Sequence, residues 1–119
     1  MEHFQQLEDF ASFLFLHLAW VDGSLHPNER ETILEKMKEI FPGNSSYEER
    51  LLVQETEYRA LGSAAAEELI TRSWSDFSSI DPEMKSKLYA GLFDIINSDS
   101  RVNEEETRLL KVLKRWLMP

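Results

Sequence analysis

The sequence predicts an all-α protein, a compact single-domain bundle of five to seven helices that takes in residues 1–119. Apolar residues recur at spacings of three and four along most of the chain, which is the period of a helix with one buried face. Strand-like alternation is absent, and the four glycines and four prolines include several that mark helix ends. A content of 42% hydrophobic and 29% charged residues is typical of one soluble globular domain.

The first predicted helix is apolar on nearly every face. A helix of this kind is buried, so we expect it to run through the centre of the fold and to end near residues 22–23. His17 lies inside it, and we expect a hydrogen-bonded core histidine rather than a metal ligand or a base. The apolar residues of this helix are Leu7, Phe10, Ala11, Phe13, Leu14, Phe15, Leu16 and Leu18.

Start and stop signals predict the second and third helices. Pro27 suits the first position of the second helix, and the Pro-Gly pair at 42–43 ends it. Ser46 and Glu49 predict a capping box for a third helix over about residues 47–61. The apolar stripe of this third helix is thin, which indicates a peripheral position.

Three more helices follow. Gly62 breaks the chain before a fourth helix, predicted over residues 64–74. Asp81 caps and Pro82 opens the fifth helix, and Asn103 caps the sixth. The residues expected to face the core on the fifth and sixth helices are Met84, Leu88, Leu92, Ile95, Ile96, Leu109, Leu110, Leu113, Trp116 and Leu117.

Composition also bears on location and on partners. The longest apolar run, residues 10–21, is too short to span a bilayer, and acidic residues precede it where a secretory signal is positively charged. Cysteine is absent, which excludes disulfides and thiolate chemistry and favours a reducing compartment. The net charge is −9, from 13 basic and 22 acidic residues, whereas nucleic-acid binding needs a basic surface. We therefore predict a cytoplasmic protein with no transmembrane segment and no nucleic-acid partner.

One phrase occurs twice in the sequence. Residues 22–29 read DGSLHPNE and residues 99–106 read DSRVNEEE. Each begins with Asp, has an aliphatic residue three positions later and ends with Glu, and each lies between two helices with apolar stripes. The first and second helices therefore form one helix-loop-helix unit, and the fifth and sixth form a second that resembles it, as an internal duplication would give.

Two interpretations of this phrase remain open. In the first, Asp22 and Asp99 close the preceding helices, and Glu29 and Glu106 occupy the third helical position, where a carboxylate reaches the free amides of the first turn. In the second, the two units pack so that all four carboxylates converge, and their mutual repulsion requires a cation. An ordinary EF-hand is excluded, because the first half of its ligand loop is missing.

The same residues resemble the tellurite-resistance protein B family, whose TerB-like domain is also found at the start of a DnaJ-like membrane co-chaperone. That family is recognised by an apolar helix that runs into A-x-x-D-G-x-(aliphatic)-x-x-x-E and by a second Asp…Glu unit near the C-terminus. The first unit here consists of Ala19, Asp22, Gly23, Leu25 and Glu29. The second unit keeps Asp99, Val102 and Glu106 but has Ser100 where the family has glycine, a departure from the pattern at the turn of that loop.

The resemblance implies a single TerB-like helical domain over residues 1–119, with paired acidic sites that hold a divalent metal. By this comparison the metal ligands are Asp22, Glu29, Asp99 and Glu106. Because every one of them is an oxygen ligand, calcium or magnesium is the expected class of ion. The resemblance also implies a stress-response role of the tellurite-resistance type, or a scaffold role that includes peripheral complexes at a membrane. It implies no known reaction.

The sequence contains no catalytic constellation. It has no H-E-x-x-H, no Glu-x-x-His pair, no G-x-S-x-G and no Gly-rich phosphate loop, so we do not expect an enzyme. The alternative to cation binding is a metal-independent protein-protein interaction module with both loops purely structural. Its candidate anchors are Trp20, Trp74 and Trp116, and its candidate acidic face is the Glu-rich stretch 47–68, although buried tryptophans and solvated acidic faces are the commoner cases.

Overall fold

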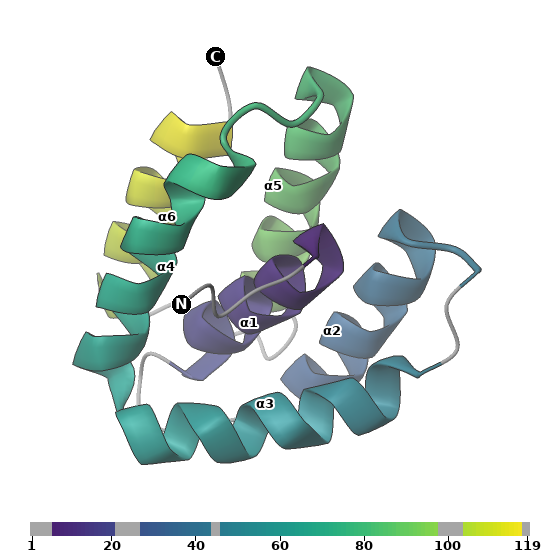
Figure 1. The fold of residues 1–119 in the computed structure, drawn as a ribbon, viewed down its shortest axis with the longest axis vertical. Coiled ribbons are helices and arrows are strands. Elements are labelled where there is room, and N and C mark those ends of the chain that lie inside the picture. Colours follow the sequence, from purple (N-terminus) through teal and green to yellow (C-terminus); the bar gives the residue numbers. More distant parts are fainter. Residues whose placement is uncertain (1–5, 21–26, 44–45, 98–103, 118–119) are drawn as a thin grey trace.

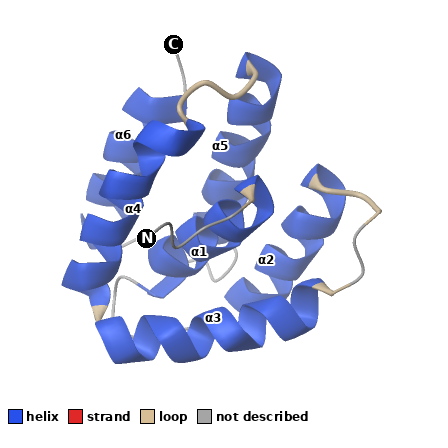
Figure 2. Cartoon of the chain, viewed as in Figure 1, coloured by secondary structure: helices blue, strands red, loops and turns tan. Residues whose placement is uncertain are grey.

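The computed structural model describes residues 6–20, 27–43, 46–97 and 104–117. Within these ranges the chain forms six α-helices and no strand, as predicted (Figure 2). They are α1 (Leu7–Trp20), α2 (Pro27–Ile40), α3 (Tyr47–Leu61), α4 (Ser63–Phe77), α5 (Pro82–Asn97) and α6 (Glu104–Leu117). They pack into one globule with a radius of gyration of 13.0 Å, which is the value expected of a single compact domain of this length. Among the described residues, no helix is long and apolar enough to cross a bilayer.

α1 is the centre of the protein and contacts each of the other five helices (Figure 1). All ten residues from 10 to 19 are buried, and this confirms the prediction made from its apolar surface. The large side chains of Phe10, Phe13 and Phe15 are fully inaccessible to solvent. Burial of phenylalanine on three sides of one helix gives the other helices a common surface to pack against.

α2 begins at Pro27, as predicted. It ends at Ile40, and the Phe41 amide extends its hydrogen-bonding pattern by donating to the Met37 carbonyl at 2.9 Å. Gly43 follows with a φ of 98°, a left-handed conformation that glycine adopts without strain. The predicted Pro-Gly stop is therefore confirmed.

α3 lies across one end of the protein, at the lower edge of the view in Figure 1, and α4 rises from its end. The corner between them is Gly62, whose φ is 83° and whose amide still bonds to the Tyr58 carbonyl at 2.9 Å. Only four residues of α3 are buried, so the prediction of a peripheral helix is confirmed: Tyr47, Leu51, Gln54 and Tyr58.

The predicted capping box of α3 is wrong. Ser46 precedes the helix, but its side chain makes no capping hydrogen bond. Its backbone has φ −105° and ψ 22°, whereas a capping serine needs an extended conformation to aim its oxygen at the first-turn amides. The start of α3 is fixed differently, by the Tyr47 hydroxyl, which donates a hydrogen bond to the Phe41 carbonyl.

α4 is longer than predicted at both ends, since it spans Ser63–Phe77 rather than residues 64–74. Its last turn is held by a tertiary contact, because the ring of Phe77 stacks on the ring of Phe10 with centroids 4.8 Å apart. Ser75 is compatible with the helix because its hydroxyl donates back to the Arg72 carbonyl at 3.2 Å.

The Asp81 cap of α5 is confirmed, and its removal gives a first prediction. The Asp81 carboxylate accepts a hydrogen bond of 2.7 Å from the Glu83 amide. Asp81→Ala leaves this amide without its partner, so we expect the free energy of unfolding to fall by about 1 kcal/mol. Urea denaturation measures the change. Asp81→Asn is the matched control, since it keeps the capping oxygen and should stay within about 0.5 kcal/mol of the unmodified protein. Equal loss in both variants would contradict the capping role.

Candidate functional site

Glu29 and Glu106 occupy equivalent positions in the two helix-loop-helix units. Each is the third residue of its helix, α2 and α6 respectively, and each is only 1% exposed. Neither side chain is without an interacting partner. The other two predicted metal ligands, Asp22 and Asp99, lie outside the described residues, as does Asn103, the predicted cap of the sixth helix.

The end of α5 lies beside the start of α2, because these helices pack antiparallel. Asp94 forms an ion pair of 2.7 Å with Lys36, and this hydrogen bond raises the pKa of Lys36. One turn earlier on α5, a Cβ added to Gly91 would lie 3.6 Å from Ile40 Cδ1, one turn further along α2. Successive residues of α5 therefore lie beside progressively earlier residues of α2, in the direction of Glu29.

The end of α1 lies beside the start of α6 in the same way. His17, near the end of α1, lines a groove together with Leu109, in the second turn of α6. Phe10, near the start of α1, lies 6.2 Å from the ring of Trp74, which stacks at 5.2 Å on Trp116 near the end of α6. α1 and α6 therefore run in opposite directions.

These two pairings bring four helix ends to the same end of the bundle: the ends of α1 and α5 and the starts of α2 and α6. A twofold relation between the hairpins α1–α2 and α5–α6 would give this arrangement. Among the described residues alone, no group of three or more His, Asp or Glu side chains could hold a metal ion. A metal site at this end would thus need ligands from the two connecting segments as well as from Glu29 and Glu106.

His17 is a hydrogen-bonded core residue, as predicted. It is 1% exposed, and its Nδ1 lies 2.9 Å from the Tyr58 hydroxyl of α3. Burial lowers the pKa of His17 to about 4, while the nearby Glu67 raises it and Arg108 lowers it. Burial raises the pKa of the Tyr58 phenol to about 12, so both rings are uncharged at neutral pH.

The three tryptophans are half-buried and contribute to the core. Trp20 stacks on Tyr58 with centroids 5.2 Å apart, and the Arg59 guanidinium lies 5.5 Å from the centroid of the Trp20 ring. Trp74 and Trp116 stack on each other. Their rings thus join α1 to α3 and α4 to α6. This packing within the protein is the role of a core residue rather than that of an interface anchor.

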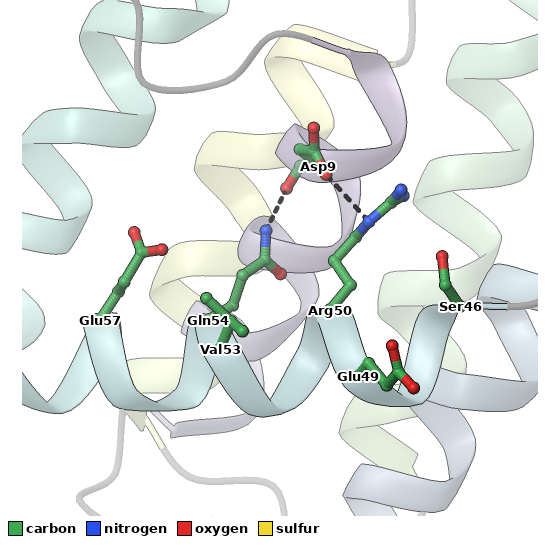
Figure 3. A pocket seen from close by; sticks show the side chains of 7 residues that line it. All are labelled: Asp9, Ser46, Glu49, Arg50, Val53, Gln54 and Glu57. Atoms are coloured by element: carbon green, nitrogen blue, oxygen red, sulfur yellow. Dashed lines mark hydrogen bonds and ion pairs between the residues drawn. The ribbon is translucent and has the colours of Figure 1, made fainter.

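A polar contact between α1 and α3 has no signal in the sequence. Figure 3 shows Gln54 and Arg50 of α3 both pointing at Asp9 of α1: the Gln54 amide donates to the Asp9 carbonyl at 2.9 Å, and Arg50 Nε lies 3.1 Å from the Asp9 carboxylate. The Ser12 hydroxyl also donates to Gln54. Asp9, Arg50 and Gln54 border a shallow groove of about 370 Å³ that Glu49, Val53 and Glu57 also line. The residues that form this polar contact are more than forty positions apart in the chain, so only the packing of α3 across α1 creates the contact.

No family model, no curated protein and no solved structure matches the chain.

Proposed function

We propose that the chain is a TerB-like helical domain that binds a divalent cation of the calcium or magnesium class through Asp22, Glu29, Asp99 and Glu106. The main support is the placement of Glu29 and Glu106, two buried carboxylates at helix starts that lie at one end of the bundle. Burial of a carboxylate is costly unless amides or a cation compensate its charge. The stress-response role of the tellurite-resistance type, or the scaffold role, rests on the sequence resemblance alone.

Capping by first-turn amides is the competing explanation for the burial of these glutamates, and one substitution separates the two. Glutamine at the third helical position still forms a capping box, but it has lost the charge that a hard cation requires. Glu29→Gln and Glu106→Gln therefore test cation binding and leave capping in place. Glu83→Gln is the matched control, since Glu83 is an exposed residue in the first turn of α5.

We expect calcium or magnesium at about millimolar concentration to raise the melting temperature and to give a calorimetric binding signal. In chelator, we expect the melting temperatures of Glu29→Gln and Glu106→Gln to be close to that of the unmodified protein. With added metal, we expect these two variants to show no rise in melting temperature. Glu83→Gln should keep the metal-dependent rise. The absence of both heat and a change in melting temperature in the unmodified protein would exclude this function.

The second candidate function is a metal-independent interaction module, and the surface of α3 favours it. Leu52 and Val53 are exposed on this helix, and Glu49 and Glu57 line the groove next to Val53. Exposed apolar side chains among carboxylates suit a basic, amphipathic partner. Capture of a protein partner in the presence of chelator would favour this function over cation binding.

A further inference from the structure

A groove of about 410 Å³ between α4 and α6 has His17 at its base. Its walls are mainly apolar and include Ile70 from α4 and Leu113 and Trp116 from α6. Volumes of this size hold small organic molecules, and such sites combine apolar walls with a few polar groups. Among the described residues that line this groove, none is Glu29, Glu106 or a residue of α3.

One buried nitrogen at this groove has no partner. His17 Nδ1 is paired with Tyr58, but His17 Nε2 is buried and has no hydrogen-bond partner among the described residues. Buried polar atoms in native proteins are almost always hydrogen-bonded, so an orphaned nitrogen at a groove indicates a missing ligand or an ordered water.

The hydrogen bond to Tyr58 determines whether His17 Nε2 is a hydrogen-bond donor or an acceptor. The Tyr58 hydroxyl has no other hydrogen-bond partner among the described residues. If His17 Nδ1 donated to it, both the Tyr58 proton and the His17 Nε2 lone pair would be unsatisfied. If Tyr58 donates, only the His17 Nε2–H group is unsatisfied, so this tautomer is favoured. The group at the base of the groove is then a donor, and its ligand must supply an acceptor.

The charged side chains at the opening of the groove further restrict which class of ligand can bind. Arg108 and Glu67 form an ion pair of 3.3 Å across the groove, and their side chains are 52% and 41% exposed. Exposed ion pairs are weak, so this one can separate to admit a molecule at little cost. Glu68 also lines the groove, so the three side chains carry a net negative charge that disfavours an anion.

We propose that this groove binds an uncharged small molecule with an apolar body and a carbonyl or similar oxygen that accepts a hydrogen bond from His17 Nε2. The body packs between Ile70, Leu113 and Trp116, and the oxygen satisfies the buried donor. This proposal does not depend on cation binding.

Two probes of similar shape test the proposal: acetophenone, which has a carbonyl oxygen, and isopropylbenzene, which has none. In an NMR titration with chelator present, we expect acetophenone to shift the His17 Nε2 and Trp116 indole signals in a saturable way. It should bind about tenfold more tightly than isopropylbenzene, the value of one buried hydrogen bond. His17→Phe should abolish this preference, so that acetophenone binds no more tightly than isopropylbenzene.

A pair of valine substitutions keeps the test decisive if His17→Phe does not fold. Val112→Phe narrows the groove without altering His17 and should abolish acetophenone binding, whereas Val53→Phe on α3 is the matched control and should leave it unchanged. Helical circular dichroism and cooperative melting establish that both variants fold. The proposal is overturned if acetophenone gives no saturable shift, if both probes bind the unmodified protein equally, or if Val112→Phe has no effect; His17 Nε2 would then bind only water.

Discussion

Replacement of Phe15 by alanine is expected to lower the free energy of unfolding by about 3–5 kcal/mol, the typical cost of truncating a buried phenylalanine. Phe15 is fully buried in α1, and its ring lies against the backbone of α5, where a Cβ added to Gly91 would be only 3.1 Å from Phe15 Cζ. Because Gly91 has no side chain, the Phe15 ring fills the space between the two helices, and alanine would leave a cavity there.

Urea denaturation measures this change, and Phe93→Ala is its matched control. Phe93 is on α5 but is 50% exposed, so its truncation should change the free energy of unfolding by no more than about 1 kcal/mol. Similar losses at the two positions would mean that α1 is not the packed centre of the protein.

Acidification should destabilise the protein through His17. Its pKa is about 4 in the folded protein and about 6.5 in the unfolded chain, so the unfolded chain binds more protons between these values. The stability that the neutral ring contributes is complete above about pH 6.5, decreases as the pH falls, and is lost below about pH 4. We expect a loss of about 3 kcal/mol across this range.

Denaturation at several pH values, with His17→Gln as the comparison, isolates this contribution. Glu67 and Arg108, the charged groups that act on His17, are present in both proteins, so their own contributions cancel in the comparison. The difference in unfolding free energy between the unmodified protein and His17→Gln should therefore become smaller as the pH falls. A difference that is constant from pH 7 to pH 4 would contradict a buried neutral imidazole.

Local chemistry explains which elements the sequence could predict. Pro27 and Asp81 act through their own backbone geometry and hydrogen bonds, so the starts of α2 and α5 follow from a few adjacent residues. Ser46 has the right identity for a cap, but its own backbone conformation, with φ −105° and ψ 22°, does not suit one. The end of α4 depends on the stacking of Phe77 on Phe10, which is sixty-seven positions away and leaves no local signal.

The candidate sites also combine features that follow from the local sequence with features that depend on how the helices pack. The third-position placement of Glu29 and Glu106 follows from the repeated phrase, and so does the expectation of paired units. Their burial depends on how α2 packs on α5 and how α6 packs on α1, which periodicity does not specify. The apolar surroundings of His17 were predictable, whereas its bond to Tyr58 and the groove beside it come from three other helices.

The position of α1 has a consequence for synthesis of the chain. Of the six helices, α1 is the first to leave the ribosome, yet part of the surface that covers it belongs to α6, the last to emerge. A nascent chain therefore carries an incompletely covered phenylalanine-rich segment until α6 has been translated. Translation products that end before α6 should bind holdase chaperones or aggregate, and slowing translation between α5 and α6 should increase both outcomes.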